Sequence, residues 1–133
     1  MNSDIDKTAK IYSGTTFYYS KLGRHSYVGY DREVTNCEIG AFCSIANGLI
    51  VGGAKHPINW VSTSPVFYNA NSGTCHHLGK LPIKITTKTI IGNDIWIGSR
   101  AIIMQGLIIG TGAVIGAGAL LSGEIFSDKV LTV

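Results

Sequence analysis

The sequence has few charged residues, few prolines and few cysteines for its length of 133 residues. Charged residues make up 14% of the chain, and no run of Lys or Arg occurs, so a nucleic-acid-binding surface is not expected. The three cysteines show no CxxC spacing, which argues against a disulfide framework and against a zinc site. We therefore expect Cys37, Cys43 and Cys75 to be reduced and buried as small apolar side chains.

Long apolar runs are also absent. Residues 101–121 form the most apolar stretch, but five glycines interrupt it, whereas a membrane-spanning helix needs about 20 consecutive apolar residues. The first ten residues are polar and of mixed charge, unlike a signal peptide. We expect a cytoplasmic protein without an integral membrane segment.

Glycine is abundant, with 17 residues, and aliphatic residues recur at every sixth position in the second half of the chain. This aliphatic series is Ile85, Ile91, Ile97, Ile103, Ile109, Ile115 and Leu121, and glycine directly follows four of its members. A second series, mostly small or apolar, precedes each aliphatic residue by two positions. A similar array runs upstream from Leu22 to Val51, with one five-residue step between Val34 and Ile39.

A period of six fits neither an α-helix nor an alternating β-strand, but it fits a triangular coil with three short strands and three tight corners per turn. The sequence therefore predicts an all-β fold, a left-handed parallel β-helix that spans residues 1–133 as one domain. Residues about 18 apart should stack at the strand spacing of about 4.8 Å. The expected ladders are Ile85 with Ile103 and Leu121, Ile91 with Ile109, and Ile97 with Ile115. A β-sandwich, the alternative, would show a period of two.

Residues 53–82 interrupt the repeat and hold all three prolines and three of the four histidines. A long loop in a regular solenoid is usually functional, and we expect this one to protrude. His56 stands where the chain leaves the coil, and histidine is a common general base near neutral pH. A loop histidine that only bonds its neighbours is the alternative. Cys75, His76 and His77 lack a second ligand pair, so no metal site is expected.

Four segments carry a resemblance to a known family. The segments IGNDIWIGS at 91–99 and VIGAGA at 114–119 resemble the hexapeptide-repeat acyltransferases. The segments GAKHP at 53–57 and WVSTSP at 60–65 are similar to those of xenobiotic and virginiamycin-type acetyltransferases, and of sugar O-acetyltransferases from capsule and lipopolysaccharide clusters. The resemblance covers roughly residues 10–121.

The resemblance implies acetyl-CoA as co-substrate and a homotrimer with each active site between two subunits. It implies that His56 takes the proton from the acceptor hydroxyl. The residues that it places along acetyl-CoA are Trp96, Gly98, Ser99, Ala117 and Gly118. Corner packing is the alternative role for Trp96. Candidates to meet the phosphates are Lys80, Lys84 and Arg100, among which no motif selects.

The favoured function is acetyl-CoA-dependent O-acetylation of a sugar hydroxyl in a surface polysaccharide or its precursor. Acetylation of an antibiotic hydroxyl is the alternative, and only the acceptor pocket separates the two. The tyrosines that could line that pocket, or else form exposed faces, are Tyr18, Tyr19, Tyr27 and Tyr30. A further alternative is a catalytically impaired β-helix, because the chain departs from the family's pattern after Leu121 and lacks its lysine near the CoA end.

Overall fold

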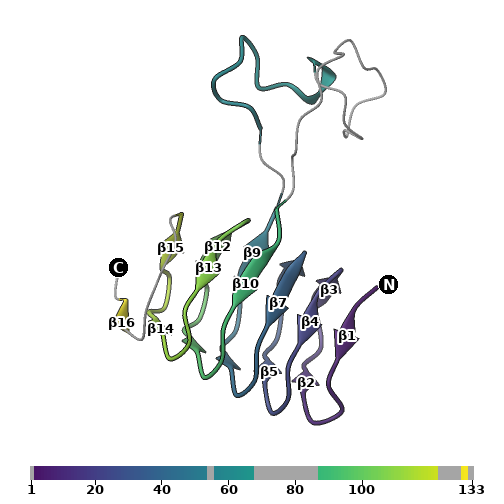
Figure 1. Cartoon of the computed structure of the whole chain (residues 1–133), viewed down its shortest axis with the longest axis vertical. Coiled ribbons are helices and arrows are strands. Elements are labelled where there is room, and N and C mark those ends of the chain that lie inside the picture. The colour runs from purple at the N-terminus through teal and green to yellow at the C-terminus, as the bar shows by residue number, and fades with distance from the viewer. Residues whose placement is uncertain (1, 54–55, 68–86, 123–129, 132–133) are drawn as a thin grey trace.

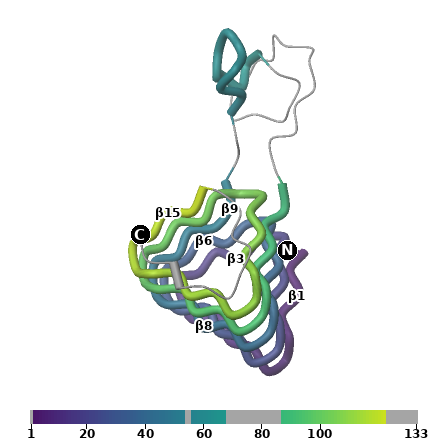
Figure 2. The backbone as a smooth tube through the Cα atoms, turned by 60° about the vertical axis from the view of Figure 1, so that its left-hand side comes forward, coloured from purple at the N-terminus to yellow at the C-terminus, as the bar shows by residue number. Residues whose placement is uncertain are grey.

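The protein is described by a computed structural model, which covers residues 2–53, 56–67, 87–122 and 130–131. Its strands wind around three faces in turn, and each strand pairs in parallel with a strand of the neighbouring coil. Figure 2 shows the triangular outline of this coil, and in Figure 1 the two termini lie at its opposite ends. The predicted all-β parallel β-helix is confirmed.

The three faces are three parallel sheets. Face A contains β1 (Asp4–Ile5), β4 (Lys21–Leu22), β7 (Cys37–Ile39), β10 (Thr89–Ile91) and β13 (Ile108–Ile109). Face B contains β2 (Lys10–Ile11), β5 (Tyr27–Val28), β8 (Ser44–Ile45), β11 (Trp96–Ile97), β14 (Val114–Ile115) and β16 (Val130–Leu131). Face C contains β3 (Thr16–Tyr18), β6 (Glu33–Thr35), β9 (Ile50–Gly52), β12 (Ile102–Met104) and β15 (Leu120–Leu121).

The aliphatic residues of the repeat stack in register inside the coil. Ile91 pairs with Ile109, Ile97 with Ile115 and Ile103 with Leu121, as predicted. In the ladder that contains Ile103, the residue one coil earlier is Val51. The prediction that Ile85 takes that position is therefore wrong, because the chain returns from the loop on face A and the preceding strand of face C is β9. Ile85 itself lies outside the described residues.

The early coils are shorter than the later ones. Leu22 pairs with Ile39, 17 residues on, whereas Ile91 pairs with Ile109, 18 residues on. The five-residue step predicted between Val34 and Ile39 is the corner from face C to face A, and the preceding coil has the same short corner.

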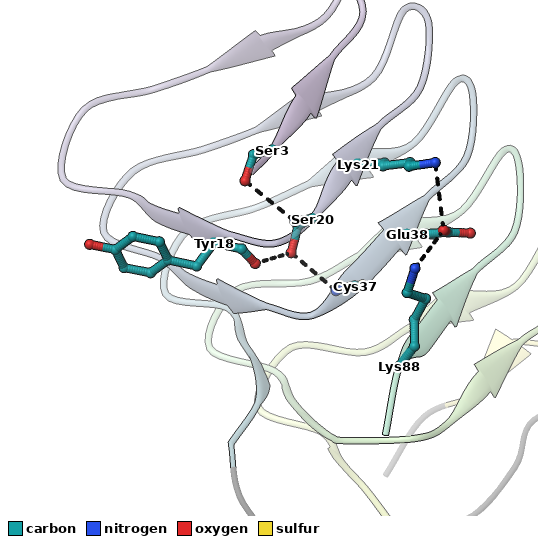
Figure 3. A network of polar contacts seen from close by, with 7 residues as sticks. All are labelled: Ser3, Tyr18, Ser20, Lys21, Cys37, Glu38 and Lys88. Carbon is teal, nitrogen blue, oxygen red and sulfur yellow. Dashed lines mark hydrogen bonds and ion pairs between the residues drawn. The ribbon is translucent and has the colours of Figure 1, made fainter. Parts of the chain in front are cut away.

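A buried hydroxyl completes this shortened corner. Ser20 is 1% exposed. Its Oγ donates to the carbonyl of Tyr18 at 2.7 Å and accepts from the backbone N–H of Cys37 at 3.0 Å (Figure 3). The Ser20 hydroxyl thus gives the buried N–H of Cys37 an acceptor, which buried N–H groups need, and Ser26 does the same for Cys43 at a six-residue corner.

Inward-facing residues form one continuous apolar core along the coil. Cys37 and Cys43 belong to it, are fully buried and form no disulfide, as expected. Burial raises the pKa of both thiols because it disfavours the thiolate. Cys75 lies outside the described residues. No helix in the described ranges is long and apolar enough to cross a membrane.

On faces A and C, the outward positions change from polar in the early coils to apolar in the later ones. On face A, Glu38 pairs with Lys88 at 2.9 Å and with Lys21 at 3.9 Å (Figure 3). The hydrogen bond from Lys88 lowers the pKa of the Glu38 carboxyl. On face C, the outward ladder Ile50, Ile102 and Leu120 is apolar, with exposed fractions of 44%, 41% and 56%. Strands β9, β12 and β15 of face C therefore present an apolar strip to solvent in the single chain, whereas the earlier coils place Thr16 and Glu33 in the same outward ladder.

Candidate functional site

The predicted loop leaves the coil at two glycines. Gly52 and Gly53 follow the last inward residue of β9 and have φ angles of 100° and 90°, which favour glycine. A Cβ atom at Gly52 would lie 2.6 Å from the carbonyl oxygen of Thr35. Figure 1 shows residues 56–67 well clear of the coil, with the short helix η1 (Pro65–Phe67) among them. The predicted protrusion is confirmed for residues 56–67, whereas residues 54–55 and 68–82 of the predicted loop lie outside the described residues.

His56 lies on this loop with an exposed imidazole. Its Nδ1 lies 2.8 Å from the carbonyl oxygen of Thr63. A carbonyl oxygen can only accept, so Nδ1 carries the hydrogen and, in the neutral ring, the lone pair is on Nε2. The contact is the one expected if His56 only bonds a neighbour, and the same contact fixes the tautomer of the neutral ring.

The same loop exposes large apolar side chains. Ile58 is 90% exposed and Val61 is 109% exposed relative to the reference state. Within one chain, the described residues leave these two side chains almost fully exposed. The loop is therefore suited to reach another molecule.

Four of the five residues predicted to lie along acetyl-CoA meet at the corner between faces B and C. Gly98 donates from its backbone N–H to Ile115 O at 2.8 Å, and Gly118 donates to Ser99 O at 2.8 Å. A Cβ atom at Gly98 would lie 2.5 Å from the backbone nitrogen of Ala117. The close approach of the two coils at this corner thus requires glycine.

A recess of about 680 Å³ opens at this corner. We call it the corner recess, and its lining residues are Asp31, Asn47, Gly48, Ser99, Arg100, Ala117 and Gly118. No described atom lies within 4 Å of a Cβ atom built on Gly118. Of the three basic residues predicted to meet the CoA phosphates, Arg100 lies at this recess. Lys80 and Lys84 lie outside the described residues.

Trp96, the fifth predicted residue, lies on strand β11 of face B rather than in a corner. It is 59% exposed, and its register neighbours are Ser44 and Val114. Corner packing is therefore not its role. Trp96 precedes Gly98 by two residues in the sequence. Its ring lies on the outside of the coil, where its small neighbours leave it accessible.

The predicted tyrosines divide between two places. Tyr27 and Tyr30 line a second recess, of about 540 Å³, together with Tyr12, and we call it the tyrosine recess. Asn47 and Ser99 line both this recess and the corner recess. Tyr18 and Tyr19 line a separate recess of about 390 Å³ with Asn2 and Thr35.

Two residues beneath the shared edge were not singled out from the sequence. Arg32 is 3% exposed, and its Nη2 donates to Asn47 Oδ1 at 3.0 Å. The backbone N–H of Tyr30 donates to the same oxygen at 3.1 Å. Burial lowers the pKa of the Arg32 guanidinium, an effect that Asp31 opposes. Arg32 occupies a position where the other coils of face C place Thr15, Leu49, Ala101 and Ala119, and a charged residue in this uncharged series was the signal in the sequence.

Within one chain, His56 and the corner recess belong to different corners. The loop leaves β9 at the corner between faces C and A, whereas the recess lies between faces B and C. Among the described residues, no group of three or more His, Cys, Asp or Glu side chains could hold a metal ion. Cys75, His76 and His77 lie outside those residues.

Comparisons with known proteins agree with the repeat pattern. Residues 88–123 match the family model described as bacterial transferase hexapeptide (six repeats). A chloramphenicol acetyltransferase of Agrobacterium fabrum is 38% identical over 101 residues, which cover 72% of this chain and 47% of that protein. A probable macrolide acetyltransferase of Lysinibacillus sphaericus is 41% identical over 95 residues, which cover 68% and 49%. The chain spans about half the length of these relatives.

Solved structures share the fold. A hexapeptide-repeat acetyltransferase of Vibrio cholerae, complexed with acetyl coenzyme A, superposes with a TM-score of 0.74 at 16% identity, over 97% of this chain and 64% of that one. A maltose O-acetyltransferase of Clostridium difficile superposes with a TM-score of 0.67 at 23% identity, over 97% and 63%. At these identities the likeness concerns the coil architecture alone.

Proposed function

We propose that this chain, which belongs to the hexapeptide-repeat acyltransferases, transfers an acetyl group from acetyl-CoA to a hydroxyl of a small acceptor. The observation that carries the proposal is the corner recess. Ala117 and Gly118 line this recess with little or no side chain, and a Cβ atom on Gly118 would meet open space, so the backbone there is accessible, as an extended pantetheine arm requires. Arg100 supplies a cation for the phosphates at the same edge.

His56 is the proposed general base. Its Nε2 would take the proton of the acceptor hydroxyl as that oxygen attacks the thioester carbonyl carbon. Collapse of the tetrahedral intermediate breaks the C–S bond, and the imidazolium returns the proton to the leaving sulfur. The hydrogen bond from Nδ1 to Thr63 O holds the ring in one orientation. No covalent acyl-enzyme is needed.

The proposed enzyme is a homotrimer in which the loop of one copy covers the corner recess of the next. This arrangement would bring His56 to a recess that lies at another corner of its own coil. It would also cover the apolar residues Ile58 and Val61 of the loop and the apolar ladder of face C. Each active site would then draw residues from two copies.

A xenobiotic hydroxyl is the leading acceptor. Relatives named for chloramphenicol and macrolide acetylation are 38% and 41% identical to this chain, which supports acceptors of that kind. The sugar hydroxyl implied by the resemblance of the segments at 53–57 and 60–65 is the second candidate. Both acceptors use the same donor and base.

The test is release of the CoA thiol from acetyl-CoA with chloramphenicol and with neutral sugars. We expect acceptor-dependent release by the parent protein. His56→Ala should lower kcat by about 100-fold or more, as for loss of a general base, without change in trimer mass or acetyl-CoA affinity. His25→Ala, an exposed corner histidine, is the control and should keep full activity. Equal turnover by His56→Ala would eliminate the proposed base. Failure of the parent to bind acetyl-CoA would favour the impaired β-helix.

A further inference from the structure

The tyrosine recess offers a ring-binding surface beside the corner recess. The rings of Tyr12 and Tyr30 come from consecutive coils, with centroids 4.9 Å apart and planes inclined by 47°. Lys10 Nζ lies 4.7 Å from the centroid of Tyr12 and covers that ring. The exposed parts of Tyr27 and Tyr30, at 43% and 48%, remain available to a ligand with an apolar ring face.

The charges of the two recesses differ. The corner recess includes the ionic side chains Asp31 and Arg100. Among the described residues, those that line the tyrosine recess carry no ionic side chain. A charged ligand would lose hydration in the tyrosine recess, and the cation beside it, the Lys10 ammonium, already lies over the Tyr12 ring. This recess therefore suits an uncharged ligand, whereas the corner recess suits one with ionic groups.

Asn47 stands where the two recesses meet. Its Oδ1 accepts from Arg32 Nη2 and from the backbone N–H of Tyr30, at 3.0 and 3.1 Å. Both partners are donors, so the amide oxygen must face them, and the Nδ2 amino group faces the other way. The side chain is exposed and lines both recesses. Its two N–H groups are thus available to a ligand oxygen at the boundary.

Arg32 fixes this orientation. The Nε and Nη1 atoms of Arg32 are buried and form no hydrogen bond within the protein. Burying a guanidinium with so few hydrogen-bond partners costs folding free energy. A residue that only filled space in the core would not need a charged side chain. Gly29 leaves the space for it, since a Cβ atom there would lie 2.2 Å from Arg32 Nη2 and 2.6 Å from Asn47 Oδ1. Gly29, Arg32 and Asn47 therefore act as one arrangement that orients the amide.

We propose that the tyrosine recess is the acceptor subsite, which binds an uncharged ring-bearing alcohol with the ring against Tyr27 and Tyr30 and an oxygen bonded to Asn47 Nδ2. The inference rests on the proposed acetyl transfer, because the adjoining corner recess is there assigned to the donor. An aryl alcohol such as chloramphenicol and a neutral pyranoside share the required chemistry.

The experiment compares acceptor and donor kinetics in matched variants. Asn47→Asp keeps the Oδ1 acceptor for Arg32 and Tyr30 but removes both N–H donors. Asn93→Asp is its control, because Asn93 Oδ1 accepts from Ala41 N–H at the opposite corner. Tyr30→Ala removes the ring platform, and Tyr19→Ala, in the separate recess, is its control. The acceptors are chloramphenicol, methyl galactopyranoside and the anionic galacturonate.

We expect Asn47→Asp and Tyr30→Ala each to raise the KM of the preferred neutral acceptor by about 10-fold. The KM of acetyl-CoA should stay within about threefold of the parent value in Tyr30→Ala, whereas Asn47→Asp is compared by its acceptor KM alone, because Asn47 also lines the corner recess. Both controls should match the parent, and galacturonate should be the poorest acceptor. The preference between chloramphenicol and the pyranoside identifies the acceptor. A rise in acceptor KM for Tyr19→Ala but not for Tyr30→Ala would overturn the proposal, as would a preference for galacturonate.

A binding measurement separates this proposal from the proposed function. Saturation-transfer NMR, without acetyl-CoA, should detect the neutral acceptor on the parent and lose it in Asn47→Asp and Tyr30→Ala. If the parent binds the acceptor in this way yet releases no CoA thiol, the acetyl transfer fails and the subsite stands. If the parent binds neither neutral acceptor, or the variants bind equally well, the subsite is refuted whatever the activity.

Discussion

Substitution of Gly98 by alanine would test both the coil packing and the donor assignment. The added Cβ atom would lie 2.5 Å from Ala117 N, 2.8 Å from Ala117 Cα and 3.0 Å from Gly116 C, all of them backbone atoms. Gly98 is not among the residues with positive φ, so the contact alone decides the outcome. Carbon atoms in contact normally lie about 3.5–4.0 Å apart, and the two coils must therefore separate by roughly 1 Å.

Such overpacking should cost about 1–3 kcal/mol of unfolding free energy. For a chain of this length, each kcal/mol lowers Tm by about 4 °C, so we expect a fall of about 4–12 °C in differential scanning calorimetry at fixed protein concentration. The acetyl-CoA KM should rise by about 10-fold, because the corner recess is lined by the displaced residues. Adding Ala117→Gly should not restore either value, since the clash is with backbone. An unchanged Tm and acetyl-CoA KM in Gly98→Ala would refute the reasoning.

Three further predictions concern the coil itself. Ile103→Ala, at a fully buried position, should lower the unfolding free energy by about 2–5 kcal/mol in urea titration, whereas its exposed neighbour Ile102→Ala should cost far less; equal losses would contradict the packing. With the third cysteine replaced by serine, Cys37 and Cys43 should not react with a thiol reagent at pH 8 until the protein is unfolded, and rapid labelling of the native state would count against their burial. Because the folded-state pKa of Glu38 lies below its ordinary value of 4.5, its stabilisation is present above that pH and is lost as the pH falls through the folded-state pKa. Glu38→Gln should thus be less stable than the parent at pH 7, by under about 1 kcal/mol, and the difference should vanish in acid; a difference that grows in acid would be inconsistent with this pairing.

The period of six was enough to predict the coil, because each strand contributes only one inward aliphatic residue and residues one turn apart must stack. The pairs Ile91–Ile109 and Ile97–Ile115 follow from that count. The partner of Ile103 in the preceding coil does not follow from that count. Counting back 18 residues enters the loop and reaches Ile85, whereas the partner in the structure is Val51. A sequence period cannot show on which face an inserted loop returns.

The site could be predicted only in part. Ser99 and Gly118 meet because they occupy equivalent corners of successive coils, so the repeat that predicts the fold also brings them together. Asn47 and Arg32 are 15 residues apart (47 − 32) and meet only through a long side chain that reaches across a corner. Sequence spacing does not encode such reach, nor does it show that Tyr12 joins Tyr30 in one recess.

Complementation between two inactive variants tests the shared active site most directly. One variant carries His56→Ala, and the other carries Gly118→Trp, which fills the corner recess. If each site takes His56 from one copy and the recess from the next, random trimers from an equal mixture should regain about one quarter of parental thiol release, since half of the loops and half of the recesses are intact. Mixed trimers that remain inactive would contradict the account.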